Sequence, residues 1–161
     1  MMRLVFFSFL TVGVWACQNT ASTDLKPLNL LSDGLPIIIQ APDSAKVVSG
    51  VLGVSQDVTV KSPADNFDVQ IFASDAITTD LSAVKASHLA EVKSGPYFSK
   101  IIEEEPAGFI YETKFDSTTL NYGFRHLKIQ GDKEYVFQTG LVGNFSLDDV
   151  RMMYEAVKNE P

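Results

Sequence analysis

Few side chains in this 161-residue chain have the types and spacing that catalysis requires. Ser82 and Lys85 stand three residues apart in a predicted helix, which is the S-x-x-K spacing at which a lysine can activate a serine nucleophile. Enzymes that use this serine–lysine pair also carry a K-T-G triplet. Gln138-Thr139-Gly140 lacks the lysine of that triplet. Because S-x-x-K is common on helices, we interpret this pair as a chance match.

Carboxylates and histidines offer a second chemistry, which is cation binding or acid–base catalysis. Glu103–Glu105 end one predicted strand, and Glu112 lies across the predicted hairpin from them. Such a group can bind a divalent cation, although a charge run at a strand end is usually solvated. His88 and His126 lack the close spacing of zinc ligands. We therefore predict no catalytic residue, no metal site and no cofactor.

The overall charge of the chain limits its partners. Lys and Arg number 13 against 20 Asp and Glu, which gives a formal net charge of −7. Nucleic-acid affinity comes largely from Lys and Arg that displace condensed counterions, so we expect no nucleic-acid partner. The single cysteine, Cys17, cannot form an internal disulfide, and stability must therefore come from packing.

The start of the chain has the pattern of a targeting segment. Residues 4–16 are uncharged and mostly apolar, and they follow Arg3. Thirteen residues are too few to span a bilayer, which needs about 20. This pattern predicts a secretory signal peptide over residues 1–16.

The residues around Cys17 add a resemblance to a known class. Val14-Trp15-Ala16-Cys17 resembles the lipobox of bacterial lipoproteins, which signal peptidase II cleaves before an acylated cysteine. The resemblance implies that Cys17 is lipidated and becomes the first mature residue. Gln18 follows instead of Asp, which implies an outer-membrane location facing the periplasm. The alternative is an ordinary signal peptide that a cysteine happens to follow.

Beyond Cys17 we expect a tether over residues 17–34 and a single globular domain over residues 35–161. Alternating apolar residues and turn signals predict strands near residues 35–40, 45–54, 58–60, 67–72, 97–104, 109–115, 120–130 and 133–142. A helix is predicted over residues 79–93, with Thr79 as its N-cap. A second, amphipathic helix follows Ser146, with Asp149 completing a capping box.

This order of elements predicts an α+β fold. We expect an antiparallel sheet of about six to eight strands, with one helix between the early and late strands and a C-terminal helix packed on the sheet. Large residues on both faces of the strand over residues 120–130 predict that both faces are covered.

The layout resembles the PsbP-like fold over roughly residues 36–159. The likeness is carried by Ile39-Gln40-Ala41-Pro42, by residues 131–137 and by residues 146–153. That family consists mostly of binding and assembly scaffolds. The resemblance therefore implies a non-enzymatic, lipid-anchored module whose partner is an envelope protein or a small apolar ligand. The alternative is a small carboxylate-based hydrolase or transferase, for which Glu103, Glu105 or Glu112 should meet a histidine in a deep pocket.

Two short segments resemble the three-residue O-glycosylation acceptor that some diderm bacteria use on exported proteins. They are Asp43-Ser44-Ala45 and Asp116-Ser117-Thr118, and both fall in predicted turns. Asn144-Phe145-Ser146 also fits the N-glycosylation pattern, but Ser146 is expected to serve as a helix cap.

Overall fold

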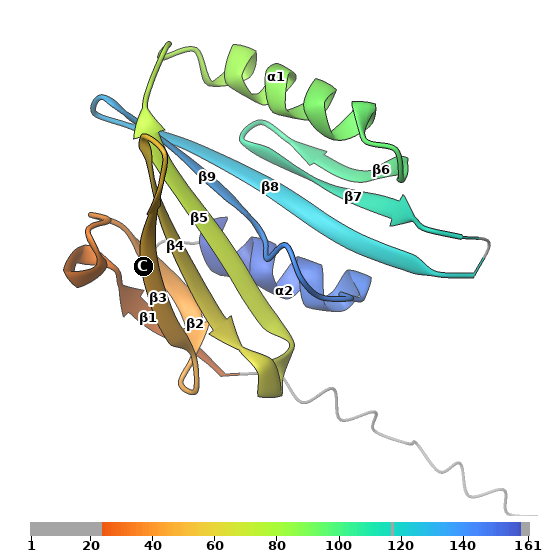
Figure 1. Ribbon diagram of the computed structural model, residues 1–161, viewed down its shortest axis with the longest axis horizontal. Helices are drawn as coiled ribbons and strands as arrows, with labels where there is room; N and C mark the ends of the chain where they lie inside the picture. The colour runs from red at the N-terminus through yellow and green to blue at the C-terminus, as the bar shows by residue number, and fades with distance from the viewer. Residues whose placement is uncertain (1–23, 117, 159–161) are drawn as a thin grey trace, which may run out of the picture.

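A computed structural model of the protein describes residues 24–116 and 118–158 (Figure 1). Nine strands and two α-helices are present in these ranges. The strands are β1 (Leu25–Asn29), β2 (Ile38–Pro42), β3 (Lys46–Leu52), β4 (Ser55–Ser62), β5 (Phe67–Asp75), β6 (Phe98–Glu105), β7 (Gly108–Lys114), β8 (Leu120–Gln130) and β9 (Lys133–Thr139). The helices are α1 (Leu81–Ser94) and α2 (Leu147–Lys158), and two short 3-10 turns are η1 (Leu31–Asp33) and η2 (Pro63–Asp65).

Seven strands form one antiparallel sheet in the order β3-β4-β5-β9-β8-β7-β6, and β1 pairs with β2 in a separate two-stranded ribbon. Most neighbours are joined by short turns, as antiparallel pairing allows. The exception is the central pair β5 and β9, in which Ala73 lies opposite Tyr135. With α1 between β5 and β6 and α2 at the C-terminal end, the predicted α+β class is confirmed.

Antiparallel pairing collects the connections between strands at two opposite ends of the molecule. We call the end where the described chain begins the proximal end. It carries Leu25, the turns at residues 43–45 and 63–66, the β7–β8 connection and residues 140–146. The opposite, distal end carries residues 30–37, 53–54, 76–80, 106–107 and 131–132. In Figure 1 the distal end lies at the upper left, and the proximal end runs along the bottom and right.

Both faces of the large sheet are covered, as alternation along β8 predicts. Phe124 turns to the face covered by α2, where its ring meets Tyr154 with centroids 5.7 Å apart. Leu127 turns to the other face and packs with Val84 of α1 and Val136 of β9. The ribbon of β1 and β2 shares the α2 face. The main core there includes Leu30, Ile39, Val60, Ile71, Phe137, Val150 and Met153.

The two helices begin at side-chain caps. At α2 the predicted capping box is confirmed, because the Asp149 N–H donates to Ser146 Oγ at 3.2 Å and the Ser146 N–H donates to Asp149 Oδ2 at 2.9 Å. At α1 the predicted cap, Thr79, is wrong. Asp80 is the N-cap, because its carboxylate accepts from the N–H groups of Ser82 and Ala83. Asp caps with a carboxylate oxygen where Thr would cap with a hydroxyl oxygen, and it stands one residue later in the chain.

The predicted start of the globular domain at residue 35 is wrong. Residues 25–34, which we assigned to the tether, are folded. Leu30 has no exposed surface, and its N–H donates to the carbonyl of Ile37 at 3.1 Å. The strand β1 could not be predicted from the sequence, because Leu25 and Leu28 are three residues apart and lack the alternation typical of a half-buried strand. The remaining tether residues, 17–23, lie outside the described residues.

Candidate functional site

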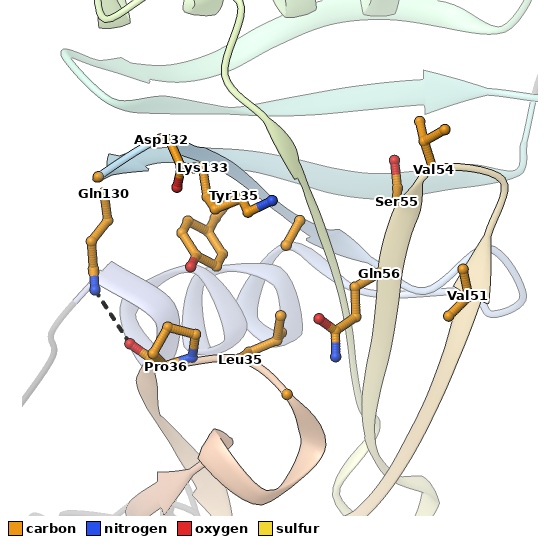
Figure 2. Close-up of a pocket in the computed structure, with 13 residues that line it drawn as sticks. Leu35, Pro36, Val51, Val54, Ser55, Gln56, Gln130, Asp132, Lys133 and Tyr135 are labelled. Atoms are coloured by element: carbon orange, nitrogen blue, oxygen red, sulfur yellow. Dashed lines mark hydrogen bonds between the residues drawn. The ribbon is translucent and has the colours of Figure 1, made fainter.

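Three connections at the distal end enclose a cleft of about 780 Å³ (Figure 2). They are the segment after η1, the β3–β4 turn and the β8–β9 turn. Its apolar lining residues are Leu35, Pro36, Val51, Val54, Ala73 and Tyr135, and its polar ones include Ser55, Gln56, Gln130, Asp132 and Lys133. A concavity of this size and mixed lining is typical of small-molecule sites. We call it the distal cleft.

The inner surface of the distal cleft comes from the main sheet and from the segment after η1. Ala73 and Tyr135 are cross-strand neighbours on β5 and β9, and both turn toward the α2 face. In Figure 2 the Tyr135 ring lies across the opening from Leu35 and Pro36. Tyr135 is only 2% exposed, and this burial raises the pKa of its phenol. Like an ordinary tyrosine, the phenol is neutral at physiological pH and has a proton to donate.

One wall depends on a glycine. Gly34 has a φ of +87°, which an L side chain rarely adopts. The amide of Gln56 lies over it and donates from Nε2 to the carbonyl of Asp33 at 2.7 Å. A Cβ at Gly34 would stand 2.0 Å from that nitrogen. Gly34 therefore lets Gln56 bind the η1 turn to β4, and this contact sets the shape of the wall.

The opposite side of the cleft is held by weaker polar contacts. Gln130 Nε2 donates to the carbonyl of Pro36 at 3.4 Å, as the dashed line in Figure 2 marks. At the rim, Lys133 Nζ lies 2.5 Å from Asp75 Oδ1, and this hydrogen bond raises the pKa of the lysine. Lys133 is paired with Asp75 and Asp132 adds a carboxylate at the β8–β9 turn, while the other lining residues are apolar or uncharged polar groups. Such a lining suits a mainly apolar ligand with one or two hydrogen-bonding groups.

The S-x-x-K pair lies away from the distal cleft. Lys85 Nζ donates to Glu104 Oε1 at 3.0 Å and to the carbonyl of Glu105 at 2.9 Å. The lysine thus joins α1 to β6. No hydrogen bond between it and Ser82 is present among the described residues.

The structure separates the four glutamates that sequence reasoning grouped. Glu104 faces α1, whereas Glu103 and Glu105 face α2. Each carboxylate also has its own partner: Arg151 for Glu103, Lys85 for Glu104, Lys158 and Tyr154 for Glu105, and Ser99 and Lys100 for Glu112. In the described parts of the chain, no three His, Cys, Asp or Glu residues are grouped to hold a metal ion.

The two histidines lie on opposite faces of the main sheet. His88 of α1 lies between two carboxylates, with Nε2 3.2 Å from Glu134 and Nδ1 3.6 Å from Glu91. The His126 ring contacts the rings of Phe137 and Tyr154, with centroids 5.7 and 5.8 Å away. Neither histidine lines the distal cleft.

Only some of the predicted modification sites lie within the described residues. Cys17 and the whole lipobox lie outside the described residues, as does Ser117 of the second glycosylation segment. Ser44 lies in the β2–β3 turn, and its hydroxyl donates to Asp65 Oδ2 at 2.7 Å. Asp116 accepts from the N–H groups of Thr118 and Thr119, and these hydrogen bonds lower the pKa of Asp116 to about 2.

Sequence reasoning did not find the distal cleft. Most of its residues come from three turns that are far apart in the chain, and only the glycines of these turns, Gly34, Gly53 and Gly131, gave a signal. All three have positive φ and mark tight connections. Such a signal locates a turn without indicating which turns meet.

Comparisons of the chain with protein-family models, curated proteins and solved structures found no match. Within the described residues, neither helix has the length and apolar character needed to cross a bilayer.

Proposed function

We propose that this protein is a lipid-anchored, exported binding or assembly module without enzymatic activity. In this proposal acylated Cys17 anchors it in the outer membrane of a bacterial cell, facing the periplasm. The lipobox resemblance of Val14–Cys17 supports the anchor, and the resemblance of residues 36–159 to the PsbP-like layout supports a binding or assembly role. Binding takes place in the distal cleft.

The distal cleft is the observation that carries the binding function. Leu35, Ala73 and Tyr135 form its buried inner surface, and the exposed side chains of Val51 and Val54 supply the apolar area that a ligand would remove from water. Gln56 and Gln130 add neutral hydrogen-bonding groups that orient a ligand. A small apolar molecule with a polar end therefore fits best. We do not propose the carboxylate-based hydrolase, because Glu103, Glu105 and Glu112 lie outside this cleft and face other partners.

The anchor is tested by Cys17→Ser. We expect this substitution to abolish labelling by an alkyne fatty acid and to leave an unprocessed or a soluble exported form, since the acceptor thiol is removed. Unchanged labelling would show that the anchor lies elsewhere.

The cleft is tested with the neutral fluorophore N-phenyl-1-naphthylamine and the soluble Cys17→Ser protein. Ala73→Phe should fill the inner surface and weaken binding about tenfold or more, which corresponds to about 1.4 kcal/mol. Val54 is 97% exposed, so Val54→Lys cannot disturb the core, and its ammonium should still weaken binding at the rim. Val48→Lys is the matched control, because Val48 is exposed on β3 outside the cleft. Equal affinities for all four proteins would refute the assignment of the cleft.

A further inference from the structure

Exposed apolar side chains gather at the two ends of the molecule. Among the described residues, every large exposed apolar side chain except Val48 lies at the proximal or the distal end. The distal group includes Val51 and Val54, which border the distal cleft. The proximal group has no part in that cleft. It consists of Tyr97, Phe115, Leu120, Leu141 and Val142, which we call the apolar tip.

Contacts between neighbouring connections hold the apolar tip together. The rings of Tyr97 and Phe115 pack with centroids 4.7 Å apart. Phe115 and Leu141 line the same hollow, of about 210 Å³. Asn121 Nδ2 donates to the carbonyl of Gly143 at 3.3 Å, which joins the start of β8 to the connection that carries Leu141 and Val142. The tip is therefore one surface built from three parts of the chain.

A series of contacts connects the apolar tip to the place where the described chain begins. Val142 shares a hollow with Pro63 of η2. The next residues of η2 reach the β2–β3 turn, because Ser44 donates to Asp65. The ion pair of Lys26 with Asp43 joins the β2–β3 turn to β1. These contacts and the strand register place Leu25 and the apolar tip at the same, proximal end of the molecule; in Figure 1 the β2–β3 turn lies at the bottom and the β7–β8 connection at the right.

The proposed lipid anchor is close to this end along the chain. Seven residues, 18–24, separate Cys17 from β1. At about 3.4 Å per residue they span at most about 24 Å. A bilayer holding the acyl chains of Cys17 is thus within reach of the proximal end, whereas the distal end lies at the far side of a sheet with strands of up to 11 residues.

The chemistry of the apolar tip suits the boundary between water and lipid. Aromatic side chains concentrate at membrane interfaces, and Leu and Val add apolar area. The acids beside the tip already have protein partners: Asp116 accepts from backbone N–H groups, and Asp65 accepts from Ser62 and Ser44. The net charge of −7 gives no attraction to anionic lipid, so the contact must rest on apolar side chains.

We propose that the apolar tip contacts the surface of the phospholipid bilayer that holds acylated Cys17. The domain then stands on its proximal end, and the distal cleft opens away from the membrane. This inference rests on the proposed lipid anchor, and it adds an orientation that an anchor on a tether does not by itself impose.

The test uses the full lipidated chain in vesicles of phosphatidylcholine and phosphatidylethanolamine. Val142→Cys and, as the matched control, Val54→Cys are each labelled with a nitrobenzoxadiazole fluorophore. Both positions are more than four-fifths exposed, so neither substitution removes a core contact. We expect the fluorophore at position 142 to emit at shorter wavelength and to be quenched by doxyl-labelled lipid. Its quenching by aqueous iodide should be several-fold weaker than at position 54.

Other outcomes would overturn the inference. If the chains float with the vesicles but positions 142 and 54 are equally open to iodide, the tip does not contact lipid, and the anchor stands. If protection at position 142 depends on the protein-to-lipid ratio, a second copy covers the tip instead. If the parent chain takes up dye at a free Cys17 thiol, both the anchor and the contact are wrong.

Discussion

Leu30 provides the most direct test of where the fold begins. It has no exposed surface and belongs to the main core, whereas its neighbour Leu31 is 64% exposed. Leu30→Ala removes a fully buried side chain, and such changes cost about 2–5 kcal/mol through lost burial and the cavity that remains. Leu31→Ala is the matched control, for which exposed positions predict a change within about 0.5 kcal/mol.

The assay is urea unfolding of the soluble Cys17→Ser protein, followed by far-ultraviolet circular dichroism. We expect Leu30→Ala to lower the free energy of unfolding by about 3.5 kcal/mol, the middle of the range for such cavities. With about 3 °C per kcal/mol for a domain of this size, the melting temperature should fall by about 10 °C. Equal effects of the two substitutions would refute the burial of Leu30 and restore residues 25–34 to the tether.

Two further predictions concern hydrogen-bonded carboxylates and caps. Ser146→Ala removes an acceptor and a donor to Asp149, and it should lower the free energy of unfolding by about 1 kcal/mol in the same urea assay. A midpoint identical to that of the parent would contradict the cap. Asp116 should titrate in carbon NMR with a pKa of about 2, because its neighbours' N–H groups favour the carboxylate. Since this pKa lies below the ordinary value of 3.8, its stabilising contribution is present above pH 3.8 and is lost as the pH falls toward 2. A midpoint near 3.8 would show that this turn does not hold the carboxylate.

Individual helices and strands could be predicted where the local signals in the sequence were strong. The helix α2 has an apolar face, with Val150, Met153 and Val157 buried, and it begins at the Ser146 cap, so both its existence and its start could be predicted. The strands β6 to β9 were found because short turns with Gly or Asp separate apolar alternating runs. Only β1, which lacks that alternation, was missed.

The order of strands and the distal cleft could not be predicted in the same way. Alternation tells which residues of β9 turn inward, but it does not indicate that β9 pairs with β5 rather than lying at an edge. The cleft depends on that pairing, since Ala73 and Tyr135 meet only across it. The four glutamates do not gather in one place for a related reason. Consecutive residues such as Glu103 and Glu104 turn to opposite faces of a strand, so a run of acids in the sequence is divided in space.

The pairing of β5 with β9 also bears on how the chain folds. It is the only contact between neighbouring strands of the main sheet that joins residues about 60 positions apart, as Ala73 and Tyr135 do. The β3–β5 and β6–β9 meanders can each form from nearby residues, which is fast, whereas closing this seam requires a long loop and is slow. Until the seam closes, β5 and β9 are both unpaired edges with apolar residues such as Ile71 and Phe137 uncovered. Aggregation during refolding should therefore begin at these two strands, and a short peptide copying β9 should slow refolding by occupying the edge of β5.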